Sequence, residues 1–227
     1  MRYQAVLFDL DGTLLDTLAD LAEASNRVLA ARGLKPYPVQ DYRYFVGSGV
    51  RHLLECILPK PLREEEEEIQ AAITAFQQEY AKNWQQHTRP YEGIVELLDY
   101  LSANGYRLSV LSNKPQHFTE LCVQTMLAAW HFDSVLGQRE GVPRKPHPAG
   151  ALETARVLGL PPSTILYAGD TGVDMRTAQQ AGMDAVGVLW GFRDAEELRA
   201  TGAEFLVQSP QELIRFLAES AAAEQGA

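Results

Sequence analysis

The fold is decided by residues 6–17, which read VLFDLDGTLLDT. Residues 5–8 are apolar or small, and a short run of this kind is typical of a strand buried on both faces in a parallel sheet. The run ends in two carboxylates, Asp9 and Asp11. A buried charge is costly unless it is paired or bound to a metal, so these side chains indicate a function rather than a stabilising role. Because alternate residues of an extended chain lie on the same side, we expect both carboxylates to face one small volume.

The turn that follows this strand is suited to an anion. Gly12 lets the backbone turn sharply, and Thr13 offers a hydroxyl and an N–H group. Together with the two carboxylates, these groups indicate phosphate chemistry with a hard metal ion. An inert strand followed by an Asp-Gly turn is the alternative that this segment leaves open when it is taken alone.

Composition limits the class of protein. The chain has 227 residues, of which 46% are apolar and 22% charged, as in an ordinary globular protein with a full hydrophobic core. Its net charge of −10 argues against nonspecific binding to nucleic acid or to an anionic membrane. No apolar run is long enough for a membrane span or a signal peptide. The only cysteines, Cys56 and Cys122, lie far apart, so we expect a cytoplasmic protein with reduced thiols, either a monomer or a homodimer.

The segment between residues 16 and 89 has a helical pattern throughout. Asp16-Thr17 is expected to begin a helix with apolar residues on one face that ends at Gly33. A second helix is expected after residues 46–49, and a third, which opens with the acidic run 64–68, continues to about Trp84.

After Pro90 the pattern alternates between helix and strand. Helices are predicted at residues 94–101, 117–126, 149–158 and 173–181, and strands at 107–111, 135–136, 165–168, 185–188 and 205–207. Such alternation predicts an α/β fold with a parallel sheet covered by helices on both faces. The preceding helical block is then an insertion between the first strand and the rest.

Further polar candidates fall where predicted strands end, which is where open α/β sheets bind ligands. Ser112 and Asn113 follow one strand, and Asp170 and Asp174 follow another. Lys145 lies in a segment stiffened by prolines, where a fixed cation would suit a phosphoryl group. Each has an ordinary structural alternative, namely a helix cap or a solvent-facing side chain.

Four segments in this order resemble the motifs of the haloacid dehalogenase-like hydrolases, most of which are magnesium-dependent phosphatases. They are FDLDGTLLDT at 8–17, SNKP at 112–115, KPHP at 145–148 and GDTGVD at 169–174. The resemblance implies a Rossmann-like core formed by residues 1–15 and 90–227. It also implies an all-helical cap domain formed by residues 16–89. His147 stands where many members have Asp, and we interpret it as an exposed residue at a helix start.

The resemblance also implies roles for individual residues. Asp9 would attack phosphorus and form an aspartyl-phosphate, while Asp11 would act first as general acid and then as general base. Mg²⁺ would be held by the carboxylates of Asp9 and Asp170 and by the backbone carbonyl of Asp11. Asp174 would orient Lys145 or a water molecule on the metal. The phosphate oxygens would be held by Thr13, Ser112, Asn113 and Lys145.

Within this family, the segments VGSGV at 46–50, YEG at 91–93 and SNKP most resemble phosphoglycolate phosphatases. The expected substrate is therefore a small phosphorylated metabolite, with Arg43 and Arg51 as candidates for reading its carboxylate. Other possibilities are a sugar-phosphate phosphatase and a phosphomutase. A noncatalytic binder of phosphometabolites is disfavoured because it has no use for a general acid beside a nucleophile. A dehalogenase is disfavoured because its chemistry needs neither Asp11 nor a metal.

Overall fold

The structure, a computed structural model, describes residues 2–225. It divides into two compact units. One comprises the chain up to Leu14 together with the chain from Pro90 onward, and the other is Leu15–Arg89. The chain passes between the units twice, and each time it forms a short strand. These strands, β2 (Leu15–Asp16) and β3 (Arg89–Pro90), pair with each other in a two-stranded sheet.

The first unit is built on a six-stranded sheet with the order β5-β4-β1-β6-β7-β8. All the strand pairs in it are parallel, which confirms the predicted α/β fold. The strands are β1 (Ala5–Phe8), β4 (Arg107–Pro115), β5 (Ser134–Gln138), β6 (Ile165–Gly169), β7 (Asp184–Val188) and β8 (Phe205–Val207).

Strand β1 lies near the middle of this sheet, between β4 and β6. All four of its residues are buried, as the apolar run predicts. Ala5 and Leu7 belong to a core cluster that includes Ala151 of α7 and Met175 of α8. Since alternate residues of a strand point to opposite faces, β1 must be apolar along its whole length to be covered by helices on both sides.

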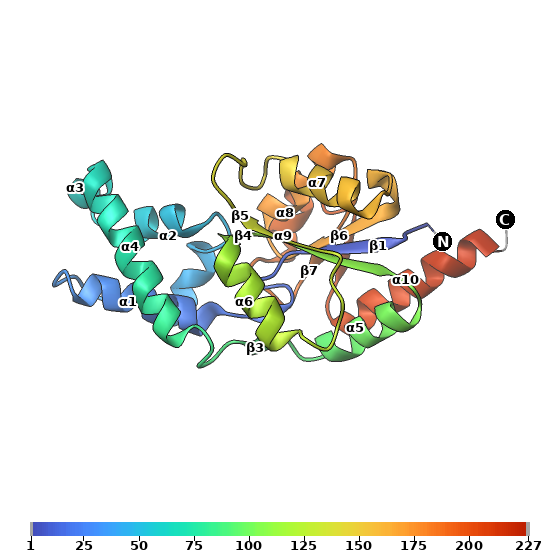
Figure 1. Cartoon of the computed structure of the whole chain (residues 1–227), viewed down its shortest axis with the longest axis horizontal. Helices are drawn as coiled ribbons and strands as arrows, with labels where there is room; N and C mark the ends of the chain where they lie inside the picture. Colours follow the sequence, from blue (N-terminus) through green and yellow to red (C-terminus); the bar gives the residue numbers. More distant parts are fainter. Residues whose placement is uncertain (1, 226–227) are drawn as a thin grey trace. The chain divides into compact units, whose positions relative to one another are not determined.

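Helices cover both faces of the sheet, with α7 and α8 on one side and α5 and α10 on the other (Figure 1). The helices of this unit are α5 (Ile94–Ala103), α6 (Gln116–Met126), α7 (Ala149–Leu158), α8 (Gly172–Ala181), α9 (Ala195–Ala200) and α10 (Pro210–Gln225). The sequence pattern located the first four, whereas α9 and α10 were not predicted. Strand β4 is also longer than predicted, because its pairing with β5 resumes at Pro115 after an irregularity.

The second unit is helical apart from β2 and the start of β3. It contains α1 (Leu18–Ala30), the 3-10 helix η1 (Val39–Tyr44), α2 (Val50–Ile57), α3 (Lys60–Arg63) and α4 (Glu66–Asn83). Thr17 stands at the N-cap position of α1 as expected, but its side chain makes no capping hydrogen bond. Instead, the buried carboxylate of Asp20 ties down the returning chain, since it accepts hydrogen bonds from the backbone N–H groups of His87 and Thr88.

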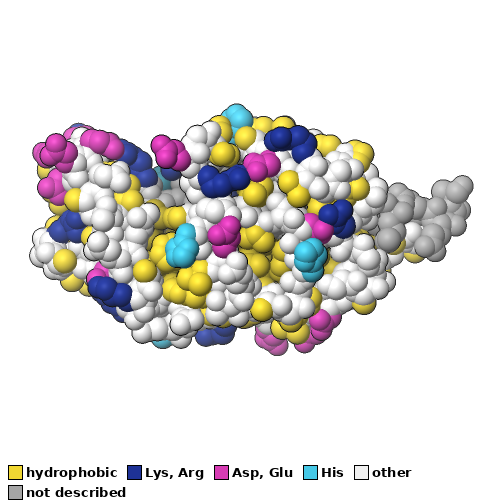
Figure 2. All heavy atoms as spheres, in the orientation of Figure 1, with side chains coloured by type: hydrophobic (Ala, Val, Ile, Leu, Met, Phe, Trp, Pro, Cys, Tyr) yellow, Lys and Arg dark blue, Asp and Glu magenta, His cyan; other side chains and the backbone are white. Residues whose placement is uncertain are grey.

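Acidic and basic side chains are interspersed over the face of the molecule shown in Figure 2. Within the described part of the chain, no helix combines the length and the apolar character needed to cross a membrane.

Candidate active site at the carboxyl ends of the strands

Three predicted carboxylates meet where the central strands end. Asp9 directly follows β1, Asp170 directly follows β6, and Asp174 lies in the first turn of α8. Each offers a carboxylate oxygen, and the three oxygens lie within 4.8 Å of one another. All three side chains are buried. The parallel sheet explains this meeting, because β1 and β6 are neighbours and end at the same edge.

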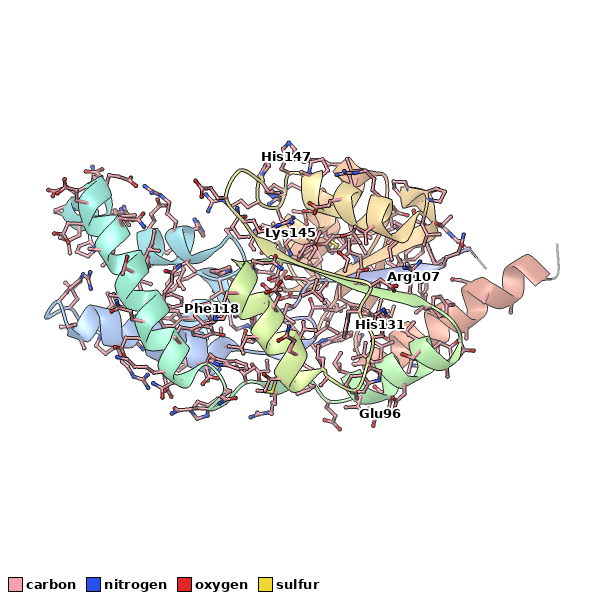
Figure 3. All side chains as sticks on the ribbon, viewed as in Figure 1. Glu96, Arg107, Phe118, His131, Lys145 and His147 are labelled. Atoms are coloured by element: carbon pink, nitrogen blue, oxygen red, sulfur yellow. The ribbon has the colours of Figure 1, made fainter. Side chains whose placement is uncertain are left out.

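Lys145 joins two of these carboxylates. Its ammonium nitrogen Nζ lies 2.9 Å from Asp9 Oδ1 and 2.7 Å from Asp174 Oδ1, and it also donates to the carbonyl oxygen of Leu111 at 2.9 Å. Three acceptors therefore match the three N–H donors of an ammonium group. Figure 3 places Lys145 in the interior and His147 at the outer edge of the molecule, which confirms that His147 is exposed.

The electrostatics of the cluster show that it lacks positive charge. Burial raises the pKa of Asp9 to about 7, although the Lys145 ammonium opposes this rise. Burial, and then the negative charges of Asp9 and Asp174, raise the pKa of Asp170 well above its ordinary value. Burial alone would lower the pKa of Lys145, but the two carboxylates beside it outweigh that effect and raise the pKa. Each carboxylate thus makes its neighbours harder to ionise.

A divalent cation would correct this imbalance. The charged groups of the site are four carboxylates and two ammonium groups, from Asp9, Asp11, Asp170, Asp174, Lys114 and Lys145. Two negative charges remain uncompensated when all six are ionised, which equals the charge of one Mg²⁺. The donors are oxygens, the ligands that Mg²⁺ prefers, so the residues present fit this metal.

Asp11 has a partner that the sequence interpretation missed. Nζ of Lys114 lies 2.9 Å from Asp11 Oδ1 and 3.2 Å from Asp11 Oδ2. The lysine side chain is only 3% exposed, and that of Asp11 is 14% exposed. The lysine was visible in the SNKP segment, but nothing in the spacing of the motifs indicated which carboxylate it would reach.

Asp170 is oriented by two donors from other parts of the chain. The Thr13 hydroxyl donates to Asp170 Oδ1 at 3.0 Å, and the backbone N–H of Phe192 donates to Oδ2 at 2.8 Å. Trp190 supports this arrangement from outside, because its indole N–H donates to the carbonyl oxygen of Thr13 at 2.9 Å. The Thr13 hydroxyl therefore serves a candidate metal ligand here, and its contact with substrate stays a prediction.

The turn at Gly12 requires glycine for two reasons. Its φ of +91° lies in the region that favours glycine. A Cβ atom at this position would also lie 2.3 Å from Asp170 Oδ2. The site therefore needs a residue without a side chain here, so that the carboxylate can approach the turn.

Ser112 and Asn113 are buried beside this cluster. The Ser112 hydroxyl accepts a hydrogen bond from the backbone N–H of Lys114 at 3.2 Å. The Asn113 amide grips the backbone of Lys145, accepting from its N–H at 2.9 Å and donating to its carbonyl oxygen at 3.1 Å. In this arrangement Asn113 positions Lys145, and direct binding of phosphate by Ser112 or Asn113 stays a prediction.

Asp174 is held on both oxygens. Oδ1 accepts from Lys145 and from the Tyr167 hydroxyl at 3.3 Å, while Oδ2 accepts from the backbone N–H and the hydroxyl of Thr171. The contacts with Thr171 form a capping box at the start of α8. This carboxylate thus pairs with Lys145, which is one of the two groups that the resemblance implied it would orient.

Comparison with known proteins agrees with this geometry. The family model described as "Haloacid dehalogenase-like hydrolase" matches residues 6–188 of the chain. A crystal structure of a protein from Lactobacillus delbrueckii subsp. bulgaricus superimposes with a TM-score of 0.88 at 32% identity, covering 94% of this chain and 98% of that one.

Two curated relatives are named for different substrates. The phosphoglycolate phosphatase of Aquifex aeolicus is 32% identical over 94% of this chain and 96% of its own length. The N-acetylmuramic acid 6-phosphate phosphatase of Pseudomonas aeruginosa is 34% identical over 96% of both chains. The full-length similarity, together with the four motifs meeting in one site, shows that the chain belongs to the haloacid dehalogenase-like hydrolase family.

Proposed function

We propose that the protein is a magnesium-dependent phosphatase that hydrolyses a small phosphomonoester through an aspartyl-phosphate on Asp9. The observation that carries this proposal is the buried cluster in which Lys145 bridges Asp9 and Asp174 while Asp170 lies within reach of the same point. Such a cluster costs stability unless a cation and an anionic substrate use it.

The residues divide the reaction between them. Asp9 attacks phosphorus in line, so that a bond forms from its carboxylate oxygen as the bond to the leaving oxygen breaks. Asp11 gives its proton to that leaving oxygen and then takes a proton from the water that hydrolyses the aspartyl-phosphate. Lys145, with Thr13, Ser112 and Asn113, offsets the charge on the phosphate oxygens.

Mg²⁺ would be held by Asp9, by Asp170 and by the carbonyl oxygen of Asp11. When bound, it would neutralise charge on the transferring phosphoryl group and fix its orientation.

Phosphoglycolate is the substrate we favour, since the chain shares the segments of phosphoglycolate phosphatases and resembles the Aquifex enzyme along its length. A sugar phosphate is the second candidate, because the Pseudomonas relative named for one is equally similar. We propose that residues 16–89 act as the cap that reads the rest of the substrate, and that the enzyme works in the cytoplasm.

The test is phosphate release from a panel of phosphorylated metabolites, measured with and without Mg²⁺ for the wild type and for Asp9→Asn. We expect Asp9→Asn to lose more than about a thousandfold in turnover, because an amide in place of the carboxylate cannot form the aspartyl-phosphate. Asp41 is exposed, so Asp41→Asn is a matched control that should keep wild-type activity. Residual turnover of Asp9→Asn within tenfold of wild type would refute the nucleophile. A strong preference for sugar phosphates would refute phosphoglycolate alone.

A further inference from the structure

We propose that Lys114 is a positioning residue that holds the Asp11 carboxyl group where it can give a proton to the leaving oxygen and then take one from the hydrolytic water. The inference rests on the proposed function, since it concerns the general acid of that reaction. Its basis is the contact of one ammonium group with both oxygens of Asp11, at 2.9 and 3.2 Å.

The ion pair between Lys114 and Asp11 is largely shielded from solvent. Exposed pairs contribute little because water and salt screen them, but the Lys114 side chain is only 3% exposed. Lysine is rarely buried to this extent unless it is paired. The pair also spans two neighbouring strands, since Lys114 belongs to β4 and Asp11 follows β1.

The backbone of Lys114 is fixed on several sides. Its N–H donates to the Ser112 hydroxyl at 3.2 Å, and its carbonyl oxygen accepts from the Thr119 hydroxyl at 3.1 Å. A Cβ atom on Gly137 would lie 2.7 Å from that same carbonyl oxygen, so this neighbour must also be small. The ammonium group is thus delivered by rigid β4 rather than by a mobile surface chain.

The two lysines of the site have separate partners. Lys145 contacts Asp9 and Asp174, whereas Lys114 contacts Asp11. A proton donor must lie within hydrogen-bond reach of the leaving oxygen. Asp11 stands beyond the end of β1 and beside the sharp turn at Gly12, so a contact at its side chain adds to what the strand fixes. The grip on both carboxylate oxygens restricts its side-chain rotation.

The experiment compares two leaving groups in Lys114→Met. Phosphoglycolate releases an alkoxide, which needs a proton, whereas p-nitrophenyl phosphate releases a stable phenolate, which does not. We expect kcat for phosphoglycolate to fall about a hundredfold, with KM within about threefold of wild type. The pre-steady-state burst of p-nitrophenolate should keep its rate within about threefold, because formation of the aspartyl-phosphate then needs no acid.

Three further variants sharpen the test. Lys114→Met in an Asp11→Asn background should cause no additional loss, because a positioning residue acts only through its partner. Lys114→Arg, which keeps the charge, should recover activity to within about tenfold of wild type. Lys82→Met is the matched control, since Lys82 pairs with Glu79 on the exposed surface of α4 and should leave all rates unchanged.

A burst that slows as much as phosphoglycolate turnover would show that Lys114 binds phosphate directly, and would overturn the proposal. So would an unchanged Lys114→Met, or losses that multiply in the double variant. Thermal unfolding checks that each variant folds. If Lys114→Met does not fold, Lys114→Arg must show the same difference between the two substrates, with a smaller loss of phosphoglycolate turnover. If the wild type hydrolyses no phosphomonoester of the panel, the proposed function fails, whereas equal losses in an active enzyme overturn only the role of Lys114.

Discussion

Asp170 illustrates how closely a single carboxylate is confined. Thr13 and the backbone N–H of Phe192 orient its two oxygens, and Gly12 and Gly191 leave room for it. A Cβ atom on Gly191 would lie 2.3 Å from the Asp170 Cβ and 2.3 Å from the Gly12 carbonyl oxygen. Neither neighbour is the flexible end of a side chain, so both the turn and the carboxylate would have to move.

We therefore expect Gly191→Ala to weaken Mg²⁺ binding by about 10- to 100-fold, the usual effect of disturbing the groups that orient a metal ligand. Isothermal titration with Mg²⁺, and the Mg²⁺ dependence of phosphate release, measure it. Gly105→Ala is the matched control. Gly105 has a φ of +74°, and a Cβ atom added there would meet no other group within 4 Å. That variant should lose about 1 kcal/mol of stability and keep its Mg²⁺ affinity. Unchanged affinity in Gly191→Ala would contradict the expectation.

Strand β4 and the loop that carries Lys145 are held together by hydrogen bonds. β4 extends past Ser112 to Pro115, and Asn113 on it binds both backbone polar groups of Lys145. The sequence suggested that the strand ends at Leu111, because the residues that follow are polar. They remain in the strand because their side chains face the site and not solvent.

Removing the contact between β4 and this loop should slow the reaction. We expect Asn113→Ala to lower kcat about 10- to 100-fold, because a small misplacement of the Lys145 ammonium weakens the stabilisation of the transition state. Steady-state kinetics with phosphoglycolate measure the effect. Asn104→Ala, on the exposed end of α5, is the control, since its amide donates only to its own helix. A variant that loses affinity for substrate but keeps kcat would instead make Asn113 a substrate ligand.

The helical unit bears on the choice of substrate through two arginines. Arg51 was a candidate reader of a carboxylate, but its guanidinium already binds Glu66 through two nitrogens, at 2.7 and 2.6 Å, and Glu55 at 2.8 Å. Arg43, which lies before the loop at residues 46–49, stays the candidate.

We accordingly expect Arg43→Ala to reduce kcat/KM for phosphoglycolate at least about tenfold more than for p-nitrophenyl phosphate, since a hydrogen bond to a charged group contributes about 1.5–3 kcal/mol. Arg51→Ala should leave the ratio unchanged and cost less than about 1 kcal/mol of stability, because its ion pairs are exposed. Equal losses on the two substrates in Arg43→Ala would place recognition of the carboxylate at other residues.

Stability and metal binding of the entire protein are coupled through the buried carboxylates. Burial raises the pKa of Asp9 to about 7, above its value in the unfolded chain, and raises that of Asp170 as well. Between about pH 4 and pH 7 the metal-free native state therefore binds more protons than the unfolded state. The contribution of Asp9 to stability is accordingly complete below pH 4 and is lost as the pH rises toward 7.

Mg²⁺ should reverse this trend, because it binds the ionised carboxylates and displaces their protons. We expect its affinity to rise about tenfold per pH unit between pH 5 and pH 7 for each proton released. The increase in Tm caused by a fixed Mg²⁺ concentration should accordingly be larger at pH 8 than at pH 5. Calorimetry at the two pH values measures it, and Asp41→Asn should behave as wild type. Equal Tm increases at both would contradict the coupling.

The sequence predicted the regular elements better than the contacts between them. Apolar periodicity located β1 and the helices from α5 to α8, and the motifs identified the residues that converge on the site. The helix α9 was too short for its pattern to stand out, although α10, with buried Leu213 and Leu217 four residues apart, carried a usable signal. The pairing of Lys114 with Asp11, separated by 103 positions, depends on strand order and could not be deduced from spacing.

The position of β1 has a consequence for synthesis on the ribosome. This strand is made first, yet its two neighbours in the sheet begin at Arg107 and Ile165. At about 5–20 residues per second, β1 waits roughly 5–20 s for β4 and longer for β6. The helical unit is continuous in sequence and can form during that interval. An apolar segment ending in Asp9 is meanwhile left without strand partners, which makes it a natural place for a chaperone to bind the nascent chain.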